Sequence, residues 1–411
     1  MNKPLLFHWA WIILATCFVN LFINYSVRLG YGVVLPEMIA DIKLTRTESG
    51  TIFNAYLFTY IALTPLTGYL TDRFGARRII TMCAFILGIG VILMGTAQSI
   101  WSACLFFAIA GIGSTGMWTS VITVVQRWFS QKRRGLALGI LSTGYGLGFA
   151  SMGAVFPLIV LYFNWRYAWY LLGISALIMA IVNWLFLRNN PESIGSLPWG
   201  EHTRVPSETS KNVAAHLSKA SLSEVFKDKN FWLIGLSYFC IAYSLYGVTT
   251  FMVDYGKYDL GMPIKTASLL ATVHGLSQIL GVLSISPLSD YWGRKKTISI
   301  SNLCITIAII GIYFFGHIWT VLFILIGLMA IFYGATFPLY GACAGDYFPR
   351  ELMGTVIGAL TPFYGLGAIS VHWVSGLVHD FTSAYHLTFI ADAFMAGAGL
   401  LLICFVSRQK K

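Results

Sequence analysis

The sequence predicts an all-α integral membrane protein with twelve transmembrane helices in two pseudo-symmetric six-helix bundles. The first observation is composition: the 411 residues are 57% hydrophobic and only 10% charged, too little polarity to cover a soluble domain of this size. The second is a repeat, because Tyr145-Gly146-Leu147-Gly148 returns 219 positions later as Tyr364-Gly365-Leu366-Gly367. A duplicated half in a strongly apolar chain predicts two bundles with a substrate site between them.

The apolar segments are long enough to be spans, because about 20 apolar residues in a helix cross about 30 Å of hydrocarbon. We predict spans at 9–36, 51–71, 79–97, 101–125, 136–162, 168–187, 231–254, 265–288, 298–316, 318–344, 354–378 and 385–406. The long polar stretch 188–229 contains three prolines and predicts a cytoplasmic linker. The chain thus divides into an N-terminal bundle (1–187), this linker and a C-terminal bundle (230–411).

The net charge of +11 could suggest a nucleic-acid partner, but its distribution argues against one. If both termini share a side, 21 of the 27 Lys and Arg fall on that side; the exceptions are Arg28, Lys43, Arg46, Arg166, Lys257 and Lys265. This positive-inside bias predicts a multi-pass protein of the cell (inner) membrane with both termini in the cytoplasm. We expect membrane lipid, and no nucleic acid, as its surroundings.

The polar side chains suggest no catalytic or metal chemistry. All seven Cys lie in apolar spans without paired spacing, which is typical of buried free thiols. The sequence shows neither a metal-ligand cluster nor a plausible catalytic triad. We therefore expect no enzyme activity, no metal and no cofactor.

The segment Gly68-Tyr69-Leu70-Thr71-Asp72-Arg73-Phe74-Gly75-Ala76-Arg77-Arg78 resembles the signature loop of the major facilitator superfamily, and 286–296 is a degenerate copy of it. The resemblance extends over the whole chain and implies a secondary transporter with alternating access, driven by protons, ions or exchange. Asp72 would end a helix at the cytoplasmic face and pair with Arg127 as a weak, reversible latch. Positive-inside anchoring would explain Arg77 and Arg78 alone, but not Asp72. The gating candidates are Asp72, Arg73, Arg77, Arg127, Asp290 and Lys295.

Two further stretches resemble the oxalate/formate and monocarboxylate porter branch, which implies small organic anions as substrates. They are Gln126-Arg127-Trp128-Phe129, followed by Arg134-Gly135-Leu136-Ala137, and the segment 190–201. Several porters of that branch carry an Arg in span eight, which this chain lacks. Its Asn24-Tyr25-Ser26-Val27-Arg28 instead resembles the anion:cation symporters for sugar acids and sialic acid. Val27 replaces the Asp that handles protons in that family, so proton symport and anion exchange both stay open.

Arg28 is the leading candidate for binding an anion. A charge this deep in a span costs several kcal/mol unless it faces water or a partner, and a guanidinium presents paired donors that match a carboxylate. Asn24, Arg28 and Tyr31 follow i, i+4, i+7 spacing, which predicts one helix face lining a cavity. The alternatives are an Arg that snorkels to the outer leaflet and a structural ion pair with Glu37 or Asp41.

Polar and aromatic side chains in other spans complete the candidate site. His274 and Gln278 are spaced i, i+4 on span eight, where His274 could bind the anion, titrate, or be a core residue bonded to a carbonyl. Candidates for coupling are His274, His372 and Asp392, although Asp392 could instead pair locally with His386. The aromatic candidates are Trp118, Tyr145, Tyr246, Tyr333, Phe337 and Tyr364, with Tyr145 and Tyr364 first because the repeat makes them equivalent.

These residues favour a secondary carrier of small organic anions, most simply a monocarboxylate such as lactate or pyruvate. One strong cation with aromatic walls suits a single carboxylate, and a path inside one chain lets a monomer function. A sugar acid or dicarboxylate would need a second cation or a more polar wall, which His274 could supply. A cation or drug exporter of the same fold fits less well because the spans hold few acids, and a sensor without transport is a further alternative.

Overall fold

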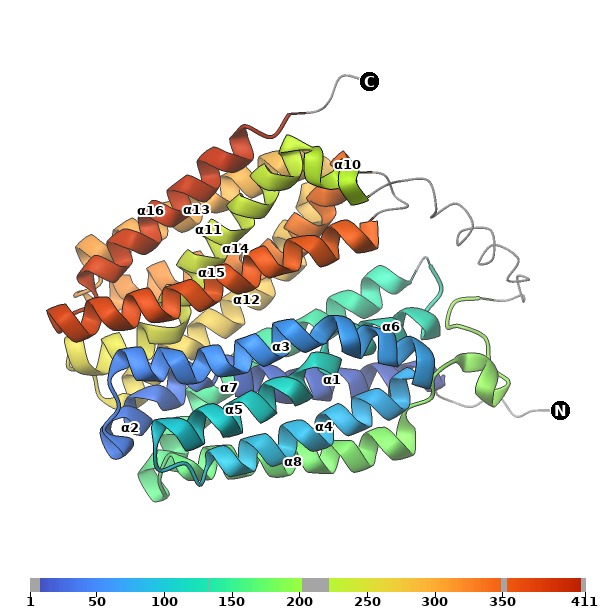
Figure 1. Cartoon of the computed structure of the whole chain (residues 1–411), viewed down its shortest axis with the longest axis horizontal. Coiled ribbons are helices and arrows are strands. Elements are labelled where there is room, and N and C mark those ends of the chain that lie inside the picture. The colour runs from blue at the N-terminus through green and yellow to red at the C-terminus, as the bar shows by residue number, and fades with distance from the viewer. Residues whose placement is uncertain (1–7, 132, 202–221, 349–352, 408–411) are drawn as a thin grey trace. The chain divides into compact units, whose positions relative to one another are not determined.

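The computed structural model describes residues 8–131, 133–201, 222–348 and 353–407. Across these ranges the regular elements are helices (Figure 1). Within the same ranges there is one isolated parallel β-bridge, between Phe129 and Trp199. The predicted all-α class is therefore confirmed. Of the predicted linker, residues 202–221 lie outside the described residues, and its first part packs on the chain before it, since Trp199 N–H donates to the Trp128 carbonyl at 2.9 Å.

The chain forms two compact units. Unit 1 comprises Met1–Lys43 and Ile52–Val205, and unit 2 comprises Leu44–Thr51 and Pro206–Lys411. The helices of the first half are α1 (Trp9–Arg28), α2 (Tyr31–Ile42), α3 (Arg46–Phe74), α4 (Ala76–Met94), α5 (Ile100–Ser114), η1 (Thr115–Met117), α6 (Thr119–Trp128), α7 (Arg134–Tyr162), α8 (Arg166–Phe186) and η2 (Pro191–Ile194). Those of the second are α10 (Leu222–Lys227), α11 (Lys229–Asp254), η3 (Tyr255–Asp259), α12 (Ile264–Trp292), α13 (Arg294–Phe315), α14 (Trp319–Tyr347), α15 (Met353–Thr382) and α16 (His386–Cys404).

Each of the twelve predicted spans corresponds to a helix or to consecutive helices. The first span is α1 followed by α2, and the fourth is α5, η1 and α6. Eleven helical segments of the described chain are long and apolar enough to cross a membrane, and α3 is not among them. It has 29 residues but carries many hydroxyl and amide groups, which lower its hydropathy.

The repeated Tyr-Gly-Leu-Gly tetrad ends in a glycine that lets two helices of one unit approach closely. A Cβ at Gly148 of α7 would lie 2.4 Å from the carbonyl oxygen of Phe22 on α1. In unit 2 a Cβ at Gly367 of α15 would lie 2.3 Å from the carbonyl oxygen of Phe239 on α11. The duplicated sequence therefore builds the same close helix contact twice, as small residues do in membrane bundles.

The signature loop also holds a repeated glycine, here for backbone conformation. Gly75 and Gly293 both have φ of 86°, a left-handed value that side chains disfavour. Each is the residue between two helices, α3 and α4 for Gly75, and α12 and α13 for Gly293. The glycine at this position of the motif is thus required by the turn.

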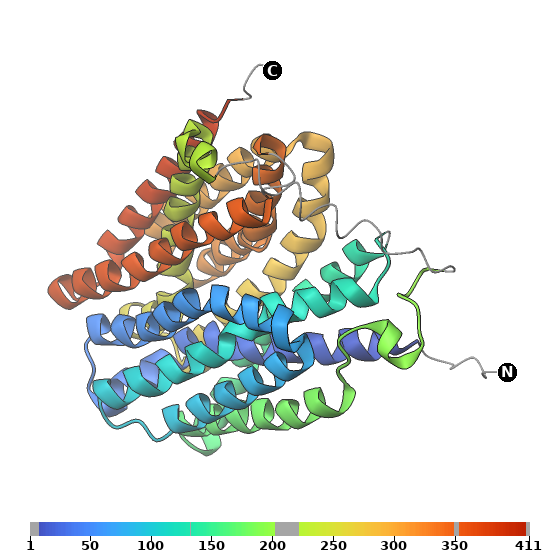
Figure 2. The same cartoon turned by 45° about the vertical axis from the view of Figure 1, so that its right-hand side comes forward.

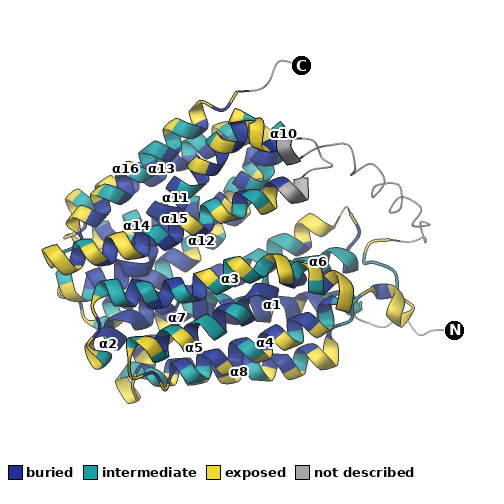
Figure 3. Ribbon diagram, in the orientation of Figure 1, coloured by how far each residue is buried: buried dark blue, intermediate teal, exposed yellow. Residues whose placement is uncertain are grey.

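Within each unit, the last helix has much of its surface exposed. In the most apolar stretch of α8 and of α16, 39% of residues are buried, against 78% for the segment of α11 and η3. Figure 3 shows exposed residues recurring along α8 and α16, whereas α1 is mostly buried. Helices α4 and α8 run side by side in two views (Figure 1 and Figure 2). Their outward faces are where lipid would lie.

Candidate functional site

Arg28 is the last residue of α1, and its side chain is enclosed by unit 1. The residue is only 6% exposed. Its guanidinium carbon lies 4.8 Å from the ring centroid of Tyr60 and 5.9 Å from that of Tyr25. Cation–π contacts of this kind contribute about 0.5–2 kcal/mol. A snorkelling side chain does not fit this burial, and Asp41 pairs elsewhere, at 2.9 Å from Arg166.

Four aromatic residues continue from Arg28 as a connected wall. Tyr25 stacks on Tyr145 with centroids 4.7 Å apart, and Trp118 meets the same Tyr145 edge-on at 5.6 Å. We call Arg28, Tyr25, Tyr60, Trp118 and Tyr145 the Arg28 cluster. It combines a permanent cation with phenol and indole groups, which are hydrogen-bond donors suited to an anion.

Asn24 and Tyr31 lie in packed surroundings of unit 1. The Ser114 hydroxyl donates to Asn24 Oδ1 at 2.6 Å, while the Tyr31 ring stacks on Phe53 and on Phe107, each at 5.0 Å. The expected i, i+4, i+7 face does not run along one helix, because α1 ends at Arg28 and α2 begins at Tyr31. These contacts suit residues that hold the Arg28 cluster in place.

Two histidines of unit 2 are held by consecutive threonines of α11. His274 Nε2 lies 3.2 Å from the Thr249 hydroxyl, and His372 Nε2 lies 3.0 Å from the Thr250 hydroxyl. Both imidazoles are fully buried. Because a hydroxyl both donates and accepts, each pair can form with the neutral imidazole in either tautomer. The threonines were not among the predicted residues, although their place beside Tyr246 in span seven was a usable signal.

Aromatic side chains extend this polar centre of unit 2. The His274 ring is 5.2 Å from Tyr333, and Tyr246 is 5.8 Å from both His372 and Tyr364. The Phe337 ring lies at the larger centroid distance of 6.4 Å from Tyr364. We call His274, His372, Thr249, Thr250, Tyr246, Tyr333 and Tyr364 the His274/His372 cluster.

Gln278 lies one turn beyond His274 on α12. It is 5% exposed, and its Oε1 makes no hydrogen bond with any residue that the structure describes. A Cβ on Gly334 of α14 would lie 2.1 Å from the Gln278 carbonyl, so α12 and α14 are in close contact here. Gln278 Oε1 is therefore a buried acceptor available to a donor.

Asp392 on α16 is a buried acid with unusual surroundings. The residue is 1% exposed, and neither carboxyl oxygen has a hydrogen-bond partner among the described residues. Gly247 of α11 leaves the space for it, because a Cβ there would lie 2.3 Å from Asp392 Oδ1. The predicted local partner, His386, instead contacts the Tyr313 ring at 5.6 Å. An ionised carboxylate without a partner is costly in such a place, so a group of this kind is suited to carrying a proton.

The residues predicted to gate form ion pairs within each unit. Arg127 Nη2 is 3.7 Å from Asp72 Oδ1, and Arg73 donates to the Tyr69 hydroxyl at 3.2 Å. In unit 2, Arg294 lies 3.3 Å from Asp290 and 2.8 Å from Asp346. Asp346 is at the repeat position of Arg127. The second unit therefore also has an ion pair here, but its two acids, Asp290 and Asp346, share the cation Arg294.

Arg77 and Lys295 hold the ends of the last helices. Arg77 Nε donates to the Trp184 carbonyl of α8 at 3.0 Å, and Lys295 Nζ donates to the Cys404 carbonyl of α16 at 2.9 Å. Cations are favoured at helix C-termini, where carbonyls lack helical partners. The structure thus gives these two equivalent residues the same contact inside their own units.

Unit 2 contains a further buried ion pair that the prediction missed. Arg46 Nε is 3.0 Å from Asp254 Oδ2, and the Tyr385 hydroxyl donates to the same oxygen at 2.7 Å. Asp380 accepts from the N–H groups of Arg46 and Thr47, both at 2.9 Å. Arg46 lay among the charges on the less basic side, and that minority position was the signal in the sequence.

Comparisons with known proteins show two relatives that match nearly the whole chain. The probable sulfoacetate transporter SauU of Cupriavidus necator is 23% identical over 416 residues, with 96% of this chain and 93% of the relative covered. The hexuronate transporter of Bacillus subtilis is 23% identical over 398 residues, covering 93% and 92%. The narrower resemblance to the oxalate/formate and monocarboxylate branch stays a prediction.

A solved structure and a family model agree on the fold. A bacterial homolog of the human lysosomal transporter Spinster superposes with a TM-score of 0.73 at 17% identity, covering 99% of this chain and 95% of that one. The model described as Major Facilitator Superfamily matches residues 17–267 and 235–411. The superfamily resemblance and the predicted fold are confirmed, and the chain is a multi-pass membrane protein that belongs to the Major Facilitator Superfamily.

Proposed function

We propose that this protein is a secondary transporter that carries a small organic anion by alternating access. The observation that carries the proposal is Arg28, a guanidinium that unit 1 encloses among the rings of Tyr25 and Tyr60. A guanidinium inside a bundle presents paired donors that match a carboxylate, and the surrounding rings strengthen such a bond by excluding water. The relatives named for sulfoacetate and hexuronate, both anions, support the same class of substrate.

A small monocarboxylate is the simplest substrate, because the Arg28 cluster supplies one permanent cation and mostly aromatic surfaces. A sugar acid is the second candidate. It carries hydroxyls beside its carboxylate, and Gln278 Oε1 and the two Thr–His pairs are polar groups of the kind that bind sugar hydroxyls. The hexuronate relative supports this second candidate.

Coupling would fall to the titratable groups buried in unit 2. His274 and His372 each hold a hydroxyl partner, whereas Asp392 has none among the described residues. We propose Asp392 as the first coupling candidate if transport is proton symport. Anion exchange would leave all three without that role.

We further propose that the charged loop residues gate the cytoplasmic side, with Asp72 and Arg127 as the latch. Their separation of 3.7 Å and partial exposure suit a pair that breaks and reforms, since exposed ion pairs contribute only about 0–1 kcal/mol. The positive-inside bias supports a cytoplasmic location of both termini. The protein would function as a monomer.

Uptake into proteoliposomes tests the proposal. The panel would hold lactate, pyruvate, sulfoacetate and a hexuronate, each with and without an imposed pH gradient. Arg28→Ala should lower uptake of the preferred anion about 10- to 100-fold, as expected for losing a charge-assisted bond of about 1.5–3 kcal/mol. Arg28→Lys should retain part of it, because the charge stays but the paired donors are lost.

Lys265→Ala is the matched control, because it removes an exposed cation of the less basic side. Its uptake should equal that of the unaltered protein. Equal uptake by Arg28→Ala and Lys265→Ala would refute the site. If Arg28→Ala abolishes uptake of a hexuronate but lactate and pyruvate are never transported, the sugar-acid candidate replaces the monocarboxylate.

A further inference from the structure

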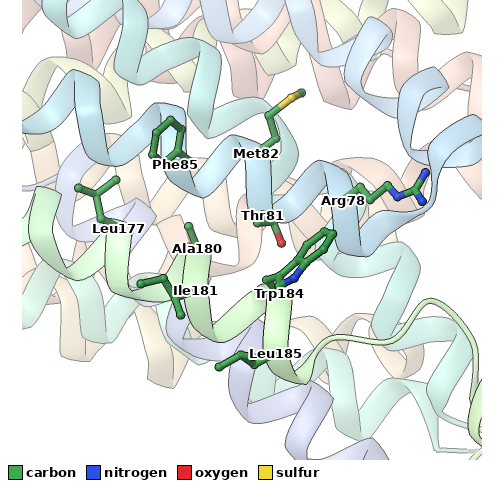
Figure 4. A pocket seen from close by; sticks show the side chains of 9 residues that line it. All are labelled: Arg78, Thr81, Met82, Phe85, Leu177, Ala180, Ile181, Trp184 and Leu185. Carbon is green, nitrogen blue, oxygen red and sulfur yellow. The ribbon is translucent and has the colours of Figure 1, made fainter.

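A groove of about 670 Å³ runs between α4 and α8 on the outside of unit 1. Its walls are apolar, and they include Met82 and Phe85 from α4 and Leu177 and Ile181 from α8 (Figure 4). Several of these side chains are exposed, Ile181 to 64%. The groove therefore opens to the surroundings of the bundle, which are acyl chains in a membrane protein.

One end of the groove is strongly basic. Arg78 lines it there, and Figure 4 shows its guanidinium extending away from the apolar side chains. Arg77 lies beside the same end, with its guanidinium carbon 4.6 Å from the centroid of the Trp184 ring that lines the groove, and Arg188 follows two residues after the end of α8. Arg77 and Arg188 are held by carbonyls at the end of α8, where Arg188 Nη1 donates to Leu185 at 2.8 Å.

No carboxylate of a described residue forms an ion pair with any of these three arginines, and Arg78 makes no hydrogen bond with a described residue either. Two arginines of the signature regions do have such partners, since Arg127 pairs with Asp72 and Arg294 with Asp346. Trp184, beside Arg78 in the groove wall, presents its ring to the Arg77 guanidinium. The basic end of the groove thus presents guanidinium groups that pair with no carboxylate of the described residues.

We propose that this groove binds an anionic phospholipid, with the headgroup phosphate on Arg78 and an acyl chain along the α4–α8 wall. Basic pockets between membrane helices bind anionic headgroups, and a guanidinium suits the oxygens of a phosphate. Trp184 lies where aromatic residues favour the headgroup level. An apolar groove with one basic end matches the shape of a lipid, whereas a free phosphate would use only that end.

The second unit does not repeat this site. The position equivalent to Arg78 is Lys296, and the cavity of about 600 Å³ beside it is lined by the cations Arg294, Lys295 and Lys296 together with the carboxylate of Asp346. Asp346 and Asp290 both lie within ion-pair distance of Arg294 there. In unit 2 the cations thus lie among carboxylates, whereas the groove of unit 1 joins an apolar wall to Arg78 with no carboxylate in its lining, so one high-affinity lipid per chain is expected.

Native mass spectrometry of the purified, delipidated full chain tests the proposal. Dioleoylphosphatidylglycerol and dioleoylphosphatidylcholine would be titrated separately, and the fraction of chain with one bound lipid measured. We expect phosphatidylglycerol to bind at least about fivefold more tightly than phosphatidylcholine, because one basic residue near an anionic headgroup has an effect of this size. Arg78→Ala should remove most of this preference, and Arg78→Lys should retain part of it.

Arg133→Ala is the matched control, since Arg133 is an exposed cation of the same unit that does not line the groove. It should keep the full preference. Equal affinity for both lipids, or equal behaviour of Arg78→Ala and Arg133→Ala, would overturn the proposal. Full displacement of the lipid by millimolar inorganic phosphate would show a free-anion site instead. Dimers that appear only with Arg78 intact would show an interface between copies. Either outcome would also overturn the lipid proposal.

Discussion

Replacing Gly148 by Ala tests whether the repeated tetrad sets the spacing of α1 and α7. The new Cβ would lie 2.4 Å from the Phe22 carbonyl oxygen and 3.0 Å from the Ser26 nitrogen, whereas ordinary contact begins at 3.4 Å. The helices must therefore separate by about 1 Å, a gap that forfeits a quarter to a half of the dispersion energy between facing atoms. Overpacking of this kind costs about 1–3 kcal/mol. Since the obstacles are backbone atoms, a side-chain rotation cannot relieve them.

The assay is thermal unfolding of the purified protein in one detergent. For a unit of about 200 residues, the expected cost lowers Tm by roughly 2–12 °C. Gly139→Ala is the control on the same helix, because a Cβ there meets nothing within 4 Å. The second unit repeats the design with Gly367→Ala and its control Gly358→Ala, whose Cβ also meets nothing. Equal Tm values for Gly148→Ala and Gly139→Ala would refute the reasoning.

Other predictions concern buried polar groups. Asn20 and Asn183 exchange two amide hydrogen bonds at 2.7 and 2.9 Å. Asn20→Leu should lower the free energy of unfolding by about 1–3 kcal/mol, and with it the Tm, because the buried Asn183 amide loses its partner. Adding Asn183→Leu to the same chain should recover part of this loss in Tm. Arg46→Ala should destabilise by about 3–5 kcal/mol because Asp254 stays buried without its cation, and Asp254→Asn added to it should raise the Tm again. Asp392→Asn should fold normally but lose the response of uptake to a pH gradient; an unchanged response would exclude Asp392 from coupling.

The fold could be predicted from the sequence because its determinants are local and repeated. Apolar runs of span length need no partner to be recognised, and α3 was predicted in this way from the run 51–71 despite its many hydroxyl side chains. The break between α1 and α2 was not predicted. Leu29 and Gly30 separate the two helices within an uninterrupted apolar run, so hydropathy carried no sign of it.

The site was predicted less completely, for a different reason. Arg28 stood out because a charge inside an apolar run is rare, and rarity is visible in a sequence. Its neighbours Tyr25 and Tyr60 did not stand out, since aromatic residues are common in spans and only packing shows which of them meet the guanidinium. The same holds for Thr249 and Thr250, whose importance comes from the two histidines that they contact on separate helices.

The comparison of the two units separates packing from chemistry. Gly75 with Gly293, Gly148 with Gly367, and Arg77 with Lys295 occupy equivalent positions and have equivalent contacts, because each bundle must make the same turn, the same close approach and the same helix end. The equivalence fails at Arg28, whose counterpart Tyr246 contacts Tyr364 and His372 instead. A residue that served the bundle alone would be under the same constraint in both halves. The charge at position 28 is therefore needed in one half only, and the proposed binding of an anion would explain such a requirement.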